Sequence, residues 1–462
     1  MNLDRTMFRE YDIRGLVKDN QLNAKSVYAI GMGIASFLAK EGNSKLLVGR
    51  DSRASSAEFR DLITRALTAS GMEVVDLGMC LVPMFYYGQY LLKIKAGVYI
   101  SASHNPANWN GFKIANDYSS TLLGDDLKTI YEIIKKEDFI SKPAARAKIS
   151  NFDIGKNYSD QLLKKLHCRK PLKVVIDCGN ATAGPIVPAI FQSAGFEVVK
   201  LYCDLDSSFP NHEPNPSAPE NKADLSKKVK DEGANIGFSF DTDGDRLGVV
   251  DEKGNIIEAD QYLILLAREL LSQNPGAKII FDVKSTRALA DDITAHGGKP
   301  IMWKTGHSYI KAKMRQEGAL LAGEVSGHVF YQENYGFDDA VFSALKLACF
   351  LSSSHKIFSQ LMATVPHYES TPTLNANCND KIKYQVVNKL TKEFQKEYNV
   401  NTINGARVEF KDGWGLIRPS SNLPVLVLRF EAKTQESLQK IINIFKAKMS
   451  RFKEIDMNWY NG

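Results

Sequence analysis

The chain has 462 residues, 44% of them hydrophobic and 24% charged, so it is a folded protein of several domains rather than a disordered one. Its net charge of +6 is mild, and lysine and arginine are spread along the chain, which argues against a nucleic-acid-binding protein and fits small anionic ligands. The first residues lack the apolar segment of a secretory signal, and no apolar run reaches the length of about 18 residues that a membrane span needs. We therefore expect a cytoplasmic protein that binds neither nucleic acid nor membrane.

A β-α-β pattern occurs three times in the first two thirds of the chain. Each copy has an apolar strand that ends in Asp, a helical stretch of about a dozen residues, a Gly stop and a second β-branched strand. The copies cover residues 45–78, 172–202 and 277–306. They predict parallel or mixed sheets covered by helices, with functional loops at the carboxyl ends of the strands.

The end of the chain does not continue this repeat. Short antiparallel strands are predicted at 407–410, 414–417 and 425–430, and an amphipathic helix at 437–449. We expect four domains around a central cleft. These are three related α/β domains with mixed sheets at 1–148, 149–252 and 253–364, and a C-terminal α+β domain at 365–462.

Polar residues crowd the loop that follows a predicted buried strand at 96–100. The loop is S101-A-S-H-N-P106, and Lys113 lies ten residues after Ser103. A serine at the end of a strand can be a nucleophile, yet the sequence has neither the G-x-S-x-G elbow of hydrolases nor a P-loop. From the residues alone, a turn capped by Ser and Asn side chains explains this loop equally well.

A second polar loop, D241-T-D-G-D-R246, lies between two predicted strands. Three carboxylates within five residues repel one another unless a cation neutralises them, and oxygen ligands select a hard ion such as Mg²⁺, Mn²⁺ or Ca²⁺. An EF-hand is disfavoured because Arg246 replaces its turning glycine and strands flank the loop. A solvated acidic turn is the remaining alternative, while Arg246 favours an anionic ligand beside the ion.

Two further loops carry hydrogen-bonding side chains. In G323-E-V-S-G-H328, which K304-T-G-H-S308 precedes, Glu324 suits a sugar diol because a carboxylate accepts two hydrogen bonds. In R418-P-S-S-N-L-P424, an arginine, two hydroxyls and an amide can bind a phosphate. Taken singly, His307 or His328 suits a structural role, and the last loop suits a plain hairpin turn.

Together with Y11-D-I-R-G15 and G111-F-K113, these loops stand in an order that closely resembles the α-D-phosphohexomutases over nearly the whole chain. Within that family, the sequence is most similar to the bacterial phosphomannomutase/phosphoglucomutase branch. The resemblance implies reversible transfer of a phosphoryl group between O1 and O6 of mannose or glucose phosphate. A phosphoserine and a hexose 1,6-bisphosphate, which is intermediate and activator, would carry the phosphoryl group, and the sugar would bind both ways round.

The resemblance also implies a role for each site residue. Ser103 would be the phosphoserine, and Lys113 the general acid/base, with a pKa lowered by nearby cations. Mg²⁺ would be bound by Ser103, Asp241, Asp243 and Asp245. The other residues would be Arg14, His104 and Arg246 around the transferring phosphate; Tyr11, Lys284, His307, Glu324, Ser326 and His328 around the sugar, with Glu324 and Ser326 on O3 and O4; and Arg418, Ser420, Ser421 and Asn422 on the other phosphate.

Two alternatives stay open. A phosphoglucosamine mutase would use the same chemistry on another sugar, and a non-catalytic phosphosugar-binding protein would need no phosphorylatable serine. The phosphate loop departs from the R-x-S-G-T or R-x-S-N-T of the family, because Ser421 and Asn422 follow Ser420; the affinity for the second phosphate is what this departure affects. We expect a monomer whose six cysteines are free thiols, because no C-x-x-C pair occurs.

Overall fold

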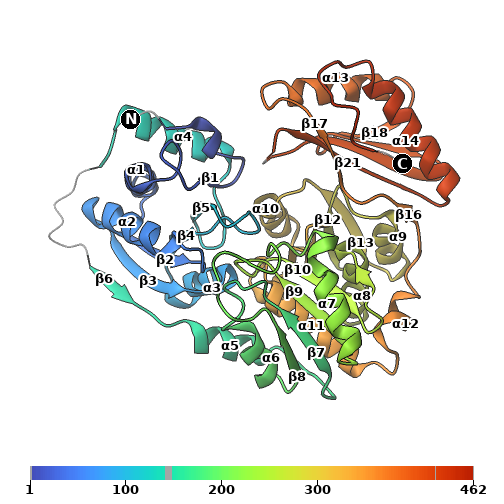
Figure 1. The fold of residues 1–462 in the computed structure, drawn as a ribbon, viewed down its shortest axis with the longest axis horizontal. Coiled ribbons are helices and arrows are strands. Elements are labelled where there is room, and N and C mark those ends of the chain that lie inside the picture. Colours follow the sequence, from blue (N-terminus) through green and yellow to red (C-terminus); the bar gives the residue numbers. More distant parts are fainter. Residues whose placement is uncertain (1–2, 141–147, 422, 461–462) are drawn as a thin grey trace.

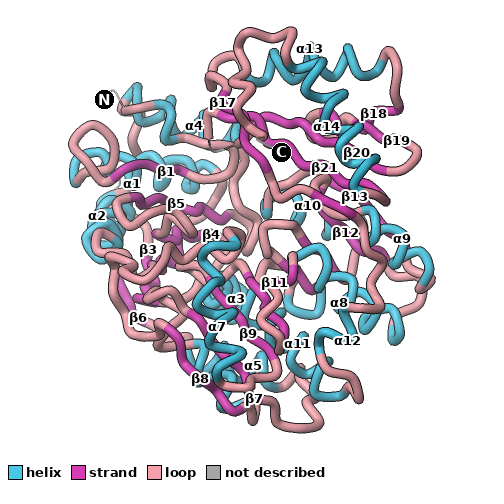
Figure 2. Tube along the Cα trace, turned by 45° about the vertical axis from the view of Figure 1, so that its right-hand side comes forward, coloured by secondary structure: helices cyan, strands magenta, loops and turns pink. Residues whose placement is uncertain are grey.

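The computed structural model describes residues 3–140, 148–421 and 423–460, which form four sheets in chain order. Figure 1 shows the blue N-terminal part and the red C-terminal part on either side, with α10 (His307–Glu317) between them. Figure 2 shows loop segments gathered in the middle of the molecule, among the strand ends. The expected fold class, three mixed α/β sheets followed by an α+β unit, is confirmed.

The first sheet is mixed and has the strand order β1-β5-β4-β2-β3-β6. Strands β2, β3, β4 and β6 run parallel, and β5 runs antiparallel to both of its neighbours. The six strands are β1 (Ile13–Leu16), β2 (Lys45–Arg50), β3 (Glu73–Met79), β4 (Ala96–Ile100), β5 (Trp109–Ala115) and β6 (Ile149–Asn151).

The second and third sheets repeat the central part of the first. Their orders are β11-β10-β9-β7-β8 and β13-β12-β14-β15. The strands are β7 (Lys173–Asp177), β8 (Glu197–Leu201), β9 (Ile236–Phe240), β10 (Leu247–Asp251), β11 (Ile256–Ile257), β12 (Lys278–Asp282), β13 (Lys299–Trp303), β14 (Leu321–Gly323) and β15 (Val329–Tyr331).

The structural repeat is longer than the β-α-β pattern in the sequence. In each sheet the two strands of the pattern are parallel neighbours, and a third strand, β4, β9 or β14, pairs in parallel with the first. A fourth strand, β5, β10 or β15, then returns antiparallel. Three of the loops predicted to be functional, at 101–106, 241–246 and 323–328, are the tips of these hairpins, so they occupy the same place in each sheet.

A glycine ends the helix in each copy of the repeat. Gly71, Gly195 and Gly297 have φ values of +82°, +89° and +75°. This left-handed conformation costs glycine little, and it turns the chain from the helix into the next strand. The Gly stops in the sequence therefore mark real helix ends.

Helices cover the three sheets. Those of the first three parts are α1 (Ala24–Lys40), α2 (Ser56–Ala69), α3 (Val82–Leu92), α4 (Gly124–Lys136), α5 (Gly155–Leu163), α6 (Val187–Ser193), α7 (Ala223–Asp231), α8 (Ala259–Gln273), α9 (Arg287–Ala295), α10, α11 (Ala340–Ser353) and α12 (Phe358–Met362). No helix that the structure describes is both long enough and apolar enough to cross a membrane.

The C-terminal part has its own antiparallel sheet and its own core. The sheet has the order β16-β21-β20-β19-β18, and β17 also pairs with β21. Its apolar core, which includes Val408, Phe430 and Phe445, is separate from the large core shared by the first three parts. Its elements are β16 (Glu369–Ser370), β17 (Leu374–Asn377), α13 (Lys383–Gln395), β18 (Asn399–Asn401), β19 (Ala406–Phe410), β20 (Gly413–Pro419), β21 (Val425–Ala432) and α14 (Gln435–Met449).

Two observations qualify the sequence-based expectations. The division at 148, 252 and 364 stays a proposal, and β6, just beyond the first boundary, still pairs with β3. The expectation of free thiols is wrong for Cys168 and Cys349, which form a disulfide across 181 residues of sequence. Packing of the segment after α5 against α11 brings them together, and no sequence pattern announces such a pair.

Candidate active site

Ser103 lies in the loop between the antiparallel strands β4 and β5. It is 2% exposed, and its φ of +50° is a left-handed conformation that persists in a non-glycine residue only where the surroundings hold it. The Ser103 N–H donates to the Ser101 hydroxyl at 2.8 Å. The Ser103 hydroxyl donates to Asp241 Oδ2 at 2.9 Å and lies 3.2 Å from His104 Nδ1. The loop therefore aims Ser103 Oγ at the acidic loop of the second domain.

Arg53 holds this loop, and sequence reasoning missed it. Asp51 neutralises its buried guanidinium at 3.1 Å. Because one fixed cation engages several carbonyls, the backbone around Ser103 is pinned. A weak signal was available, since D51-S-R53 follows the first strand of the repeat. The carbonyls that accept from Arg53 are those of Ser103, Asn105, Pro106 and Trp109.

Arg14 and His104 flank the same loop. Arg14 donates to Asn105 Oδ1 at 2.7 Å and to Asp12 Oδ2 at 2.5 Å. Burial favours a lower pKa for Arg14, but Asp12, Tyr11 and Asp243 together outweigh burial, so the pKa is raised and Arg14 stays charged. Burial, with Arg246 and Arg14 nearby, lowers the pKa of His104 well below its ordinary value. The Ser103 loop thus carries the neutral imidazole of His104 and has a fixed cation next to it, Arg14 of β1.

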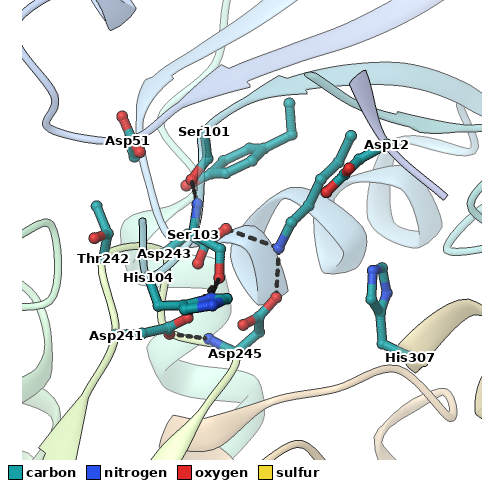
Figure 3. Close-up of polar contacts among 12 residues, drawn as sticks. Asp12, Asp51, Ser101, Ser103, His104, Asp241, Thr242, Asp243, Asp245 and His307 are labelled. Carbon is teal, nitrogen blue, oxygen red and sulfur yellow. Dashed lines mark hydrogen bonds and ion pairs between the residues drawn. The ribbon is translucent and has the colours of Figure 1, made fainter. Parts of the chain in front are cut away.

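Three buried carboxylates face Ser103 from the loop between β9 and β10 (Figure 3). Asp241, Asp243 and Asp245 are fully buried, and one oxygen of each lies within 4.8 Å of the others. Burial and the two neighbouring carboxylates raise the pKa of Asp241 well above its usual range. Among the residues that the structure describes, Asp243 Oδ1 and Asp245 Oδ1 receive no hydrogen bond. Buried carboxylate oxygens without donors fit a hard divalent cation, so this cluster is a candidate metal site.

Lys113, in the middle of β5, contacts the same cluster. Its Nζ lies 2.8 Å from Asp243 Oδ2 and 2.5 Å from Asp245 Oδ2. Burial lowers the pKa of Lys113, but these two carboxylates outweigh burial and hold the pKa well above its ordinary value. In the chain by itself the nearest charges are carboxylates rather than cations. The lowered pKa was expected beside a metal ion and stays a prediction.

Arg246 connects this cluster to the third domain. Its Nε donates to His328 Nε2 at 3.1 Å, and His328 Nδ1 lies 3.1 Å from Asp338 Oδ2. Arginine can only donate, so Nε2 of His328 accepts, and we infer that the ring proton sits on Nδ1, toward Asp338. Asp338 also lies 3.5 Å from the buried Lys311. Sequence reasoning missed Asp338 and Lys311, because neither belongs to a polar loop motif.

The structure brings Tyr11, His307 and Glu324 together. The rings of Tyr11 and His307 meet edge to face at 5.0 Å, and Glu324 Oε1 accepts from the N–H of Gly306 at 2.5 Å. In Figure 3, His307 stands across from the Ser103 group. Burial raises the pKa of Glu324. These side chains come from the first and third domains and form a second, adjoining polar cluster.

Lys284 and Ser326 lie on neighbouring loops of the third domain. Lys284 Nζ is 3.6 Å from Asp282 Oδ2, and Asp282 Oδ1 accepts from the N–H of Val325 at 3.2 Å. Ser326 offers its carbonyl to the hydroxyl of Ser217 at 2.8 Å. Asp282 therefore ties the Lys284 loop to the loop of Glu324 and His328.

The loop at 418–424, predicted to bind a phosphate and called the phosphate-type loop below, connects β20 and β21 in the C-terminal part. Arg418 is buried and donates to Ser421 Oγ at 3.3 Å, and Ser420 Oγ accepts from the N–H of Leu423 at 3.1 Å. Asn422 lies outside the described residues. No contact in the described chain joins this loop to Ser103. Instead, Ser421 lines a cavity of about 930 Å³ together with Glu10 and Tyr309, which are close in sequence to Tyr11 and His307.

The fold and the site are those of a phosphohexomutase. Each of the three α/β domains has one hairpin with a polar tip, and the fourth domain has a loop with the side chains of a phosphate site. Models of the phosphoglucomutase/phosphomannomutase family match nearly the whole chain. The α/β/α domains I, II and III match residues 5–141, 156–254 and 258–368, and the C-terminal domain matches 374–448.

Known proteins agree with this assignment. The phosphomannomutase/phosphoglucomutase of Pseudomonas aeruginosa is 44% identical over 446 residues, which cover 96% of this chain and 95% of that protein. A crystal structure of a phosphoglucomutase/phosphomannomutase family protein from Burkholderia thailandensis has a TM-score of 0.91 at 38% identity and covers 97% of this chain and 98% of its own. An N-acetylphosphoglucosamine mutase of Aspergillus fumigatus, in complex with GlcNAc-6P and magnesium, shares the fold at 13% identity with a TM-score of 0.61 over 94% of each chain. The chain belongs to the phosphoglucomutase/phosphomannomutase family.

Proposed function

We propose that this enzyme is a phosphomannomutase/phosphoglucomutase that moves a phosphoryl group reversibly between O1 and O6 of mannose and glucose phosphates. One observation carries the chemistry: the buried Ser103 hydroxyl donates to Asp241, inside a cluster of three carboxylates that also contacts Lys113. The 44% identity to the Pseudomonas aeruginosa enzyme along 96% of the chain supports the choice of substrate.

We assign Ser103 the role of phosphoserine. In the first transfer, the bond between phosphorus and Ser103 Oγ breaks while phosphorus bonds to the free sugar hydroxyl, whose proton passes to Lys113. The resulting 1,6-bisphosphate turns round, and the other phosphoryl group returns to Ser103. A phosphoserine carries a charge of about −1.5 to −2, which Arg14 and Arg246 are placed to offset beside the loop.

Asp241, Asp243, Asp245 and the phosphate on Ser103 would hold Mg²⁺, which fits their oxygen-only donor set. The ion supplies neutralisation of the charge on the transferring group. Lys113 shares Asp243 and Asp245 with this site. Neutralising those carboxylates would remove the interaction that keeps Lys113 protonated, so Lys113 would become able to accept a proton.

The remaining residues would hold the substrate in either direction. Glu324 and Ser326 would bind the O3 and O4 hydroxyls, beside Tyr11, Lys284, His307 and His328. Arg418, Ser420, Ser421 and Asn422 would bind whichever phosphate is not reacting. We propose that the enzyme works as a monomer in the cytoplasm, which size-exclusion chromatography with light scattering and cell fractionation would test.

A mutase assay tests the proposal. Glucose 1-phosphate, mannose 1-phosphate and glucosamine 1-phosphate would each be supplied with Mg²⁺ and a trace of glucose 1,6-bisphosphate. Comparable kcat/KM on the first two sugars is the expected result. A strong preference for the amino sugar would make the enzyme a phosphoglucosamine mutase, and binding without turnover of any of the three would refute a mutase.

A further inference from the structure

Lys383, the first residue of α13, is a buried lysine close to the phosphate-type loop. It is only 3% exposed. Its Nζ donates to the carbonyl of Ser420 and, at 2.9 Å, to the carbonyl of Leu423, and it lies 2.6 Å from Asp380 Oδ1. Two of the three donors of this ammonium group thus have carbonyl acceptors, and Asp380 adds an ion pair. Hydrogen bonds and an ion pair together offset the cost of burying a lysine.

The two carbonyls that bind Lys383 lie at either end of the turn between β20 and β21. Within the same turn, Ser420 Oγ accepts from the N–H of Leu423, and the N–H of Ser420 donates to the carbonyl of Val425 at 3.0 Å. Arg418, at the end of β20, reaches Ser421 Oγ. Lys383 therefore binds this segment on both sides of Ser421, which lines the cavity.

The ammonium group also changes the electrostatics of the loop. A free carbonyl oxygen repels a phosphate oxygen, whereas a carbonyl that accepts from an ammonium group has one of its two lone pairs engaged and part of its negative charge offset. Lys383 engages two such carbonyls and leaves Arg418 and Ser421 as groups that can face an anion. A positive charge directly behind the loop adds to the attraction for phosphate.

We propose that Lys383 is a positioning residue that holds the phosphate-binding loop in the shape that accepts the distal phosphate of the sugar. This inference rests on the proposed function, because it takes the Arg418 loop to be the distal phosphate site. The two hydrogen bonds from Lys383 to the carbonyls of Ser420 and Leu423 are the observations that carry it.

Asp380, the carboxylate partner of Lys383, contributes less to the position of the loop. Asp380 Oδ2 lies 3.7 Å from Nη1 of Arg9, which belongs to the first domain and lines the same cavity. The Asp380 side chain is 41% exposed and that of Arg9 18%, so solvent screens this pair. The positioning effect is therefore assigned to Lys383 and its two carbonyl bonds.

The test compares Lys383→Met with Lys448→Met. Lys448 is a matched control, because it is a buried lysine of the same domain whose Nζ also contacts a carbonyl and a carboxylate, those of Glu393 and Glu397. For Lys383→Met, we expect KM for glucose 1-phosphate to rise by about tenfold with kcat nearly unchanged, since binding common to ground and transition state is lost. For Lys448→Met, we expect the melting temperature to fall and KM to stay at the wild-type value.

An unchanged KM in Lys383→Met, or an equal rise in both variants, would overturn the inference. If Lys383→Met does not fold, Lys383→Arg takes its place, because a planar guanidinium cannot reach three convergent acceptors as an ammonium group does. A smaller rise in KM is then expected, and no rise refutes the role. The proposed function is judged separately, by whether the wild-type enzyme turns over glucose 1-phosphate at all.

Discussion

The loop of Ser103 and the loop of Arg418 are both turns between antiparallel strands, but they are held in different ways. The Ser103 loop is fixed from two domains: Arg53 binds its carbonyls, and Asp241 of the second domain accepts from its hydroxyl. In the Arg418 loop, Lys383 of the same domain binds the carbonyls of Ser420 and Leu423. Leu423 in this loop is 50% exposed, whereas Ser103 is 2% exposed.

This difference matches two tasks. A group that transfers phosphate needs charges fixed in advance in a site that excludes water, because electrostatic stabilisation is strongest there. A group that holds the non-reacting phosphate must release it and accept the other end of the same sugar. The first task requires burial between domains, and the second is served by a more open loop on a domain that has a core of its own.

The largest expected effect comes from Ser103→Ala. Removal of the phosphoryl acceptor should lower kcat by about five orders of magnitude or more, as loss of a covalent nucleophile does elsewhere. Intact-mass analysis after incubation with glucose 1,6-bisphosphate should show no phosphorylated protein. Ser101→Ala is the matched control, because the Ser101 hydroxyl accepts from the Ser103 N–H and hydrogen-bonds to Asp51 but has no proposed part in phosphoryl transfer. Retained activity in Ser103→Ala would end the phosphoserine mechanism.

Asp243→Asn should have the next largest effect. The change removes one charge from the buried cluster, and we expect kcat/KM to fall by about a thousandfold, equivalent to several kcal/mol of charge stabilisation. Chelation with EDTA should inactivate the wild-type enzyme, and added Mg²⁺ should restore it but not the variant. Asp251→Asn, in the same sheet but outside the cluster, should keep its Mg²⁺ dependence; Mg²⁺-independent turnover by the wild type would contradict the metal assignment.

Lys113→Arg separates charge from proton transfer. Arginine keeps the positive charge beside Asp243 and Asp245 but does not deprotonate in proteins. We expect kcat to fall by about a hundredfold to a thousandfold, the usual range for loss of a general acid or base. Circular dichroism should show an unchanged fold, and a fully active variant would show that Lys113 only balances charge.

Arg418→Lys tests the Arg418 loop, and we expect it mainly to raise KM. A lysine keeps the charge but loses the two-pronged geometry that suits phosphate, so KM should rise by about tenfold while kcat changes little. Steady-state kinetics with glucose 1-phosphate measure both constants. A fall in kcat with KM unchanged would mean that this loop takes part in the phosphoryl transfer itself. That result would contradict the assignment of transfer to one loop and of phosphate binding to the other.

Ser421→Ala should have the smallest effect. One neutral hydroxyl is lost from a loop that also has Arg418 and Ser420, and a net hydrogen bond of about 1 kcal/mol corresponds to a rise in KM of roughly fivefold. Inhibition by inorganic phosphate should weaken by the same factor. A rise as large as that of Arg418→Lys would show that the hydroxyl, rather than the guanidinium, dominates the phosphate site.

Much of the fold and of the candidate site could be predicted from the sequence, because the signals are local. Strand and helix periodicity and the Gly stops predicted the β-α-β units, and the observed strands begin and end within a few residues of the expected ones. The hairpin return strands β5, β10 and β15 were not predicted as part of the repeat. Pairing with a neighbour decides their direction, and periodicity carries no information about that.

The sequence by itself determined which side chains the loops carry and in which order, since composition and turn residues are properties of short segments. Only the tertiary structure decided which charges meet. Lys113 and Asp245 are 132 residues apart and touch, so a carboxylate from a distant segment raises the pKa of Lys113 in the chain by itself. Arg53, Asp338, Lys383 and the Cys168–Cys349 disulfide act through partners far away in the chain or through backbone carbonyls. Every residue has a backbone carbonyl, so the sequence does not show which carbonyl a side chain will bind. Contacts between distant segments depend on how the domains pack.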